Sequence, residues 1–119
     1  MTDERAPGAE GPWRPAGRLD ELPNDGGGVS VEIHGHRLAL FREGERVHAI
    51  ADACPHMGAS LGMGVALDGD VTCPWHGWHF RLADGRNTDG LEACVATFPA
   101  RVAADGSIEV ALPPAPAAE

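Results

Sequence analysis

The sequence predicts an all-β fold, a small antiparallel barrel or sandwich of about 8 to 10 short strands. Three observations support this expectation. Glycine and proline account for 16 and 10 of the 119 residues, which is about twice their usual share. Short segments alternate apolar with polar residues, and pairs of a polar residue and a glycine lie between them. No segment has the apolar spacing of a long amphipathic helix.

The expected strands are short segments with an apolar residue at every second position. The clearest ones span residues 29–33, 37–41, 47–52 and 108–112. Glycine and the polar residue before it tolerate positive φ, which tight hairpin turns require. Five such pairs lie along the chain: His34-Gly35, Glu43-Gly44, Asp68-Gly69, Asp84-Gly85 and Asp105-Gly106.

One folded domain is expected between two flexible ends. A chain of 119 residues is long enough for a single modest core, and too short for a catalytic domain with a separate cofactor domain beside it. Residues 1–15 are polar and rich in proline and glycine, and residues 113–119 contain only proline, alanine and glutamate. Proline cannot continue a central strand or a helix. The folded domain is therefore expected to span residues 16–112.

The acidic composition argues against some classes of partner. Nine basic and 18 acidic residues give a formal net charge of −9, and an acidic surface repels nucleic acids and anionic membranes. We therefore expect no nucleic acid and no membrane as a partner. The N-terminal residues have no apolar stretch typical of a signal peptide, and no run reaches the ~20 apolar residues that cross a bilayer. These features predict a soluble, cytoplasmic protein.

Cysteine and histidine are the residues best suited to chemistry. Three cysteines are an odd number for a disulfide framework, and six histidines accompany them, so metal binding is the better hypothesis. Two short segments each combine one cysteine with one histidine. Cys54-Pro-His56 is followed, after sixteen residues, by Cys73-Pro-Trp-His76. Two such loops on neighbouring hairpins could close over a metal from opposite sides.

Two kinds of metal centre fit these four side chains. Zinc accepts two thiolates and two imidazoles in a tetrahedral site. Zinc fingers, however, usually carry both cysteines in one arm and both histidines in the other, whereas each arm here is mixed. A dinuclear [2Fe–2S] centre suits mixed arms, because each arm can give its thiolate to one iron and its imidazole to the other. The arrangement therefore favours an iron–sulfur cluster over a structural zinc domain.

The two arms resemble the signature of Rieske iron–sulfur proteins. The similarity includes the spacing within each arm, the proline after each cysteine and the glycine after His76. It extends over residues 73–80 and 97–102. The resemblance implies a Rieske-type fold of stacked small antiparallel sheets. It also implies one [2Fe–2S] cluster at the tip of two loops, which lie within residues 52–80.

The resemblance assigns a role to each ligand. Cys54 and Cys73 would bind the inner iron as thiolates, and His56 and His76 would bind the outer iron as neutral imidazoles. Replacing two thiolates by imidazoles makes the cluster less negative, which favours the uptake of an electron. A one-electron carrier is implied rather than a stand-alone catalyst. Oxygenase large subunits also need a mononuclear iron domain, for which this chain has no room.

Two departures distinguish the chain from the high-potential Rieske proteins of respiratory complexes. Those proteins form a disulfide between their loops, and the corresponding positions here are Ala59 and Trp75. They also place serine and tyrosine hydroxyls near the cluster, where this chain has Trp78 and Phe80. The chain is more similar to Rieske-type ferredoxins of bacterial oxygenase systems and to small subunits of the nitrite reductase type.

Each of these resemblances implies its own partners. As a ferredoxin, the chain would take electrons from a flavin-dependent reductase and pass them to a terminal oxygenase or a similar oxidoreductase. As a subunit of the nitrite reductase type, it would be a non-catalytic part of a larger reductase. In either case Met57, Leu61 and Trp75 are expected in an apolar docking rim beside the histidine-bound iron. The oligomeric state stays open.

Five further residues have simpler interpretations than metal binding. His34 and His36 are expected at a polar hairpin tip, and His79 is expected to be an exposed strand histidine. Trp78 is expected to be a packing residue. Cys94 is expected to be a small buried strand residue rather than a third thiol ligand.

The missing hydroxyl donors predict a low midpoint potential. With Trp78 and Phe80 in place of serine and tyrosine, the reduced cluster lacks donors that would stabilise its added negative charge. We expect a potential of about −150 mV, nearly independent of pH around neutrality. Protein-film voltammetry between about pH 6 and pH 9 measures both properties. A potential above about +100 mV, or a steep slope through pH 7, would contradict the expectation.

Overall fold

The computed structural model describes residues 13–54, 58–74, 77–90 and 92–112. Over these ranges the chain forms ten strands and two short 3₁₀ helices. The strands are β1 (Trp13–Arg18), β2 (Val29–Ile33), β3 (His36–Glu43), β4 (Arg46–Ala51), β5 (Val65–Leu67), β6 (Asp70–Thr72), β7 (His79–Arg81), β8 (Thr97–Phe98), β9 (Ala100–Val102) and β10 (Ser107–Ala111). The helices are η2 (Leu19–Glu21) and η3 (Leu61–Met63).

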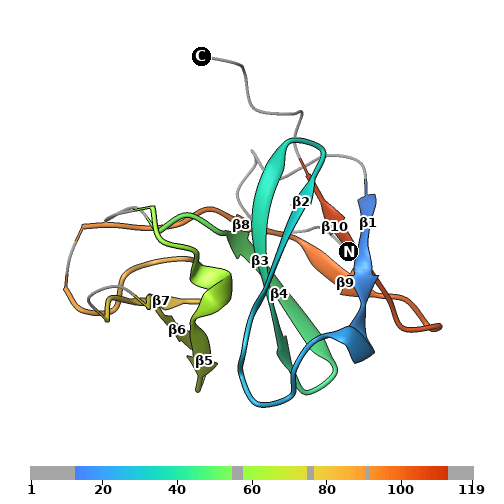
Figure 1. Cartoon of the computed structure of the whole chain (residues 1–119), viewed down its shortest axis with the longest axis horizontal. Coiled ribbons are helices and arrows are strands. Elements are labelled where there is room, and N and C mark those ends of the chain that lie inside the picture. Colours follow the sequence, from blue (N-terminus) through green and yellow to red (C-terminus); the bar gives the residue numbers. More distant parts are fainter. Residues whose placement is uncertain (1–12, 55–57, 75–76, 91, 113–119) are drawn as a thin grey trace.

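The strands form three antiparallel sheets. The central sheet has the order β2-β3-β4-β8, and the other two have the orders β1-β10-β9 and β5-β6-β7. In Figure 1 the central sheet lies between β5, β6 and β7 on one side and β1, β9 and β10 on the other. The predicted all-β class with small antiparallel sheets is confirmed. In the part of the chain that the structure describes, no helix is long and apolar enough to cross a membrane.

Pairs of a polar residue and a glycine form the tight turns of two hairpins. The loop between β2 and β3 consists of His34 and Gly35, whose φ angles are 51° and 81°. A type I′ turn requires positive φ at both of these positions. Asp68 and Gly69 join β5 to β6 with φ angles of 55° and 85°. His36 begins β3 directly after its turn, so the two neighbouring histidines lie at a hairpin tip, as predicted.

Strand β3 is buried on both faces, and its side chains alternate between two cores. Leu38 and Leu40 belong to a core that includes residues of β10. Ala39 and Phe41 belong to a second core that includes residues of β6 and β7. All four are at most 1% exposed. A strand covered on both sides needs apolar residues at every position. This explains the uninterrupted apolar run of the segment. Strands β3 and β4 both contribute residues to the two cores and so connect the outer sheets.

Strand β1 begins at Trp13, earlier than the domain boundary expected at residue 16. It pairs with β10, and its register shifts between Pro15 and Gly17. Proline is tolerated there because β1 is an edge strand, where one backbone donor is not needed for pairing. The Arg101 guanidinium lies 4.0 Å from the centre of the Trp13 ring, a cation–π contact that ties β1 to β9. The ends, residues 1–12 and 113–119, lie outside the described residues.

Substituting the central aromatic residue of the second core tests this architecture. Phe41 is fully buried, so Phe41→Ala leaves a cavity and should lower the free energy of unfolding by about 3–5 kcal/mol. Met63 is 77% exposed, so the control Met63→Ala should change the free energy of unfolding by less than about 0.5 kcal/mol. Urea unfolding followed by circular dichroism measures both. Equal losses in the two variants would contradict the placement of Phe41 in the core.

Candidate metal centre

The first arm, residues 52–62, leaves the end of β4 and leads into η3. The Cys54 N–H donates to the Ala59 carbonyl at 2.8 Å, and the Gly58 N–H donates to the Cys54 carbonyl at 2.7 Å. Gly58 has a φ of 74°, a left-handed conformation that glycine adopts without strain. These bonds close the arm on itself and fix the backbone of its cysteine.

The second arm, residues 73–79, joins β6 to β7 and is closed in the same way. The Cys73 N–H donates to the carbonyl of Trp78 at 2.7 Å. Gly77, directly before that carbonyl residue, has a φ of 73°. In both arms the cysteine donates to the carbonyl five positions later, and a left-handed glycine precedes the acceptor. The two arms therefore share one local geometry, although the expected histidine follows the cysteine at a different spacing in each.

Both arm cysteines are buried in one core. Cys54 and Cys73 are each 1% exposed, and both belong to the cluster that contains Val71 and Phe80. None of the three cysteines is in a disulfide. A thiolate in such an apolar environment needs a compensating positive charge, which a bound metal supplies. One buried thiol from each of two matching loops fits a group that takes two thiolate ligands.

The two expected histidine ligands, His56 and His76, lie outside the described residues, as do Met57 and Trp75. Within the described ranges, no group of three or more histidine, cysteine, aspartate or glutamate side chains is arranged to hold a metal. The burial of Cys54 and Cys73 is compatible with the expected ligand set but does not test it. The complete set of four ligands remains a prediction.

The residues at the positions of the missing hydroxyls pack in the core. Phe80 is fully buried, and Trp78 is half-buried against the same cluster. Their ring centres are 6.3 Å apart, with the planes tilted by 45°. Ala59, at one of the positions that carry the loop disulfide in high-potential proteins, is 9% exposed. The predicted packing role of Trp78 is confirmed.

Asp52, at the beginning of the first arm, is a candidate that the sequence did not bring to attention. Its side chain is 1% exposed, and its carboxylate accepts four hydrogen bonds from three segments of the chain. The available signal was an acidic residue directly after an apolar strand and two positions before a candidate ligand. By itself that pattern is also typical of an exposed loop.

His79, at the start of β7, is paired with an aspartate. Its backbone N–H donates to Asp89 Oδ2 at 2.8 Å, and its Nδ1 lies 2.9 Å from Asp89 Oδ1. The side chain is 45% exposed, which agrees with the predicted exposed strand histidine. The hydrogen bond from the His79 backbone, followed by the one from its side chain, lowers the pKa of the Asp89 carboxyl. This pair fastens the end of the second arm to the segment after β7.

Two expectations about neighbouring residues are wrong. Leu61 is fully buried, because η3 directs it into the core that contains Phe41, so it cannot belong to an exposed docking rim. Cys94 is exposed rather than buried. It lies in an isolated bridge with Arg86, outside the named strands, and no sheet covers it there.

Several known proteins are similar to this chain in sequence and fold over most of its length. A family model described as the Rieske [2Fe-2S] domain matches residues 12–99. A protein named as an NADH-dependent nitrite reductase small subunit, from Mycobacterium tuberculosis, has a TM-score of 0.76 and 34% identity over 82% of this chain and 92% of that one. The ferredoxin of carbazole 1,9a-dioxygenase from Nocardioides aromaticivorans IC177 has a TM-score of 0.74 and 28% identity, over 82% and 97% of the two chains.

A longer curated protein is similar over part of its length. The oxygenase component of chloroacetanilide N-alkylformylase from Rhizorhabdus wittichii is 39% identical over 96 residues, which cover 75% of this chain and 27% of that protein. The chain therefore spans about a quarter of this curated relative.

Asp89, which is paired with His79 at the end of the second arm, predicts a pH dependence of stability whose sign is known. Because the pKa of Asp89 is lowered from its ordinary value of 3.8, its contribution to stability is fully present above that value and is lost as the pH falls through the lowered pKa. Asp89→Asn should remove this part of the acid dependence. An NMR titration of the carboxyl groups gives the pKa directly.

A second variant separates the two hydrogen bonds to this carboxylate. His79→Ala removes the imidazole and keeps the backbone N–H, which is the larger cause of the shift, so Asp89 should retain part of its lowered pKa. Asp105, whose pKa is lowered by the Ser107 backbone N–H, is the internal control in the same spectrum. A complete return of Asp89 to its ordinary pKa would contradict the backbone assignment.

Proposed function

The chain belongs to the Rieske [2Fe–2S] domain family, and we propose that it is a one-electron carrier whose cluster is held by Cys54, His56, Cys73 and His76. The observation that supports these ligands most directly is the pair of buried thiols, one in each of two arms with the same closed geometry. A bound [2Fe–2S] cluster accepts and releases one electron, and two imidazole ligands raise its potential above that of a four-cysteine cluster.

The chain's own residues prepare the site for such a cluster. The two cysteines supply thiolates from within an apolar core, where Phe80 and Val71 keep water away from the sulfur atoms. Gly58 and Gly77 adopt the left-handed backbone conformation that each arm needs before its closing carbonyl, which glycine takes without strain. A centre shielded from water on its cysteine side would exchange electrons on its histidine side.

We favour a diffusible carrier of the oxygenase type. This chain matches the ferredoxin of carbazole 1,9a-dioxygenase over 97% of that ferredoxin, and a complex of oxygenase and ferredoxin in carbazole 1,9a-dioxygenase has been solved. By analogy, this chain would take an electron from a flavin-dependent reductase and deliver it to a terminal oxygenase. The net charge of −9 favours a partner with a basic docking surface. None of the three cysteines is in a disulfide, which is compatible with a reducing cytoplasm as the place of action.

A second candidate is a non-catalytic subunit of a larger reductase. The similarity to the nitrite reductase small subunit, at 34% identity and 92% coverage of that chain, favours it. A carrier would run alone on gel filtration of a cell lysate and would pass electrons in many turnovers between separately purified partners. A subunit would instead co-elute with a large reductase.

Ligand variants test the proposed site. The purified wild type should contain two iron atoms and two acid-labile sulfides per chain. Cys54→Ser, Cys73→Ser, His56→Ala and His76→Ala should each lose most of the iron and sulfide, together with the absorption of the cluster. Cys94→Ser is the matched control, because Cys94 is exposed and lies outside both arms, and it should keep the full content.

Two results would overturn the assignment. One zinc ion per chain without sulfide would indicate a structural zinc domain. A loss of iron in Cys94→Ser comparable to that in the other cysteine variants would show that the ligand set is wrong. For the carrier role, the reduced protein should be reoxidised by a terminal oxygenase mixed with its substrate. Failure with every candidate oxygenase, together with co-elution with a reductase, would favour the subunit instead.

A further inference from the structure

Asp52 is the one buried charged side chain in the described part of the chain. Its Oδ1 accepts hydrogen bonds from Ser30 Oγ at 3.0 Å, from Ser60 Oγ at 2.9 Å and from the Gly62 N–H at 2.9 Å. Its Oδ2 accepts one from Arg37 Nη2 at 3.0 Å. Burying a carboxylate is costly unless its oxygens are hydrogen-bonded and a positive charge lies beside it. Both conditions are met here.

The four donors come from three parts of the fold. Ser30 lies in β2 and Arg37 in β3, whereas Ser60 and Gly62 lie where the first arm returns. Asp52 itself lies where that arm begins. One carboxylate thus joins both ends of the first arm to two strands of the central sheet.

Backbone hydrogen bonds also hold Asp52 between β3 and the start of η3. Its N–H donates to the Arg37 carbonyl at 3.0 Å, and its own carbonyl accepts from the Leu61 N–H at 2.7 Å. Gly62 is shaped to this site, since a Cβ there would overlap Ser30 Oγ and lie 3.0 Å from Asp52 Oδ1. The carboxylate therefore occupies a site that backbone, hydroxyls and glycine define together.

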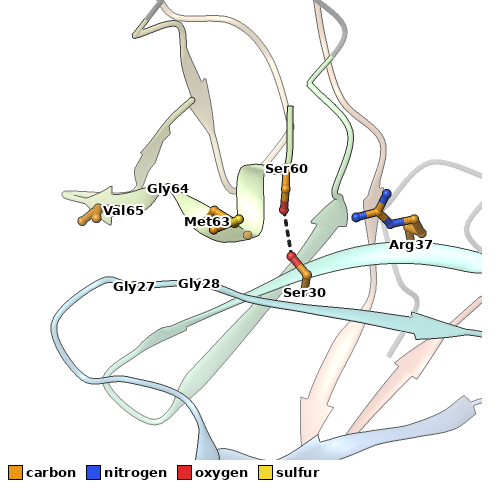
Figure 2. Close-up of a pocket in the computed structure, with 9 residues that line it drawn as sticks. Gly27, Gly28, Ser30, Arg37, Ser60, Met63, Gly64 and Val65 are labelled. Carbon is orange, nitrogen blue, oxygen red and sulfur yellow. Dashed lines mark hydrogen bonds between the residues drawn. The ribbon is translucent and has the colours of Figure 1, made fainter. Parts of the chain in front are cut away.

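The positive partner lies at the surface, beside an open hollow of about 540 Å³. Figure 2 shows the Ser30 and Ser60 hydroxyls, 2.9 Å apart, pointing towards each other in the lining of this hollow, with Arg37 to one side. The Arg37 side chain is 64% exposed, while that of Asp52 is 1% exposed. Arg37 can therefore be exchanged without leaving a hole in the core, which allows the ion pair to be tested from its exposed side.

We propose that Asp52 is a positioning residue for the cluster, which holds the first arm so that Cys54, two residues later, meets the metal in one fixed geometry. This inference rests on the proposed function. A buried carboxylate needs hydrogen bonds and a positive charge beside it, and the bonds it makes here fix where the first arm begins and where it returns. Groups that orient metal ligands from behind typically change metal affinity about 10- to 100-fold when removed.

The second arm is held differently. The aspartate that binds His79 at the end of this arm is Asp89, which lies after β7 and whose side chain is 35% exposed. No buried carboxylate of the described residues lies at the root of the second arm. The first arm is thus fastened to the central sheet from inside the core, and the effect of Asp52 should fall on Cys54 and its iron.

The main test compares Asp52→Asn with the wild-type holoprotein. Asparagine keeps one oxygen but turns an amide N–H₂ towards Arg37, so two donors oppose each other. Cluster release to an iron chelator should become about 10- to 100-fold faster, and the g values of the reduced cluster in electron paramagnetic resonance should shift. Glu109→Gln is the matched control, because Glu109 accepts from Arg101 at 2.8 Å in a distant sheet. It should change neither property.

A rescue variant distinguishes positioning from mere stability. In Asp52→Asn combined with Arg37→Gln, the new glutamine can accept from the asparagine amide, so the release rate and g values should return towards the wild type. The free energy of unfolding, measured in parallel by urea, need not follow them. Wild-type g values and release rates in Asp52→Asn would overturn the proposal, even if that variant unfolds more easily.

Two milder variants keep the proposal testable if Asp52→Asn does not fold. Ser60→Ala removes one donor, and Arg37→Gln removes the positive charge beside the carboxylate. Each should accelerate cluster release, whereas unchanged rates in both would overturn the proposal. The iron and sulfide content of the wild type separates this result from the proposed function. A wild type without a [2Fe–2S] cluster would refute the carrier itself, whereas a loaded wild type with indifferent Asp52 variants would refute only the positioning role.

Discussion

The burial of β3 on both faces is the constraint on which the rest of the structure depends. Leu38 and Leu40 close the core shared with β10, and Ala39 and Phe41 close the core that contains the two arm cysteines. Apolar burial is the largest favourable term in folding, and a strand that contributes to both cores couples their stability. The sheet that bears the second arm packs on the core that contains the arm cysteines, to which β3 and β4 both contribute.

The two cysteines of the candidate metal centre lie in one of these two cores. Each arm leaves the end of a strand, carries its cysteine into the core, and closes with a backbone hydrogen bond to the carbonyl five residues later. The backbone bonds fix each loop, and the surrounding side chains exclude water from the cysteines. Each arm thus contributes one buried cysteine to the same apolar core. A cluster with two buried thiolate ligands requires such an arrangement.

The two arms differ in how they are fastened. Asp52 is buried and joins the first arm to β2 and β3, while Asp89 is partly exposed and joins the end of the second arm to the segment after β7. Water competes with the hydrogen bonds of an exposed carboxylate and does not reach those of a buried one.

The sequence by itself determined those features that depend on residues close together along the chain. Alternation of apolar residues gave the strand segments, the polar-glycine pairs gave the hairpin turns at His34 and Asp68, and the spacing of cysteine and histidine gave the family. Only the tertiary structure decided that Leu61 is buried, that Cys94 is exposed and that Asp52 collects its donors. Those donors lie 8 to 22 positions away along the chain. Periodicity tells which residues share a face of a strand, but burial and hydrogen bonding depend on which distant segment covers that face, and no local pattern encodes that choice.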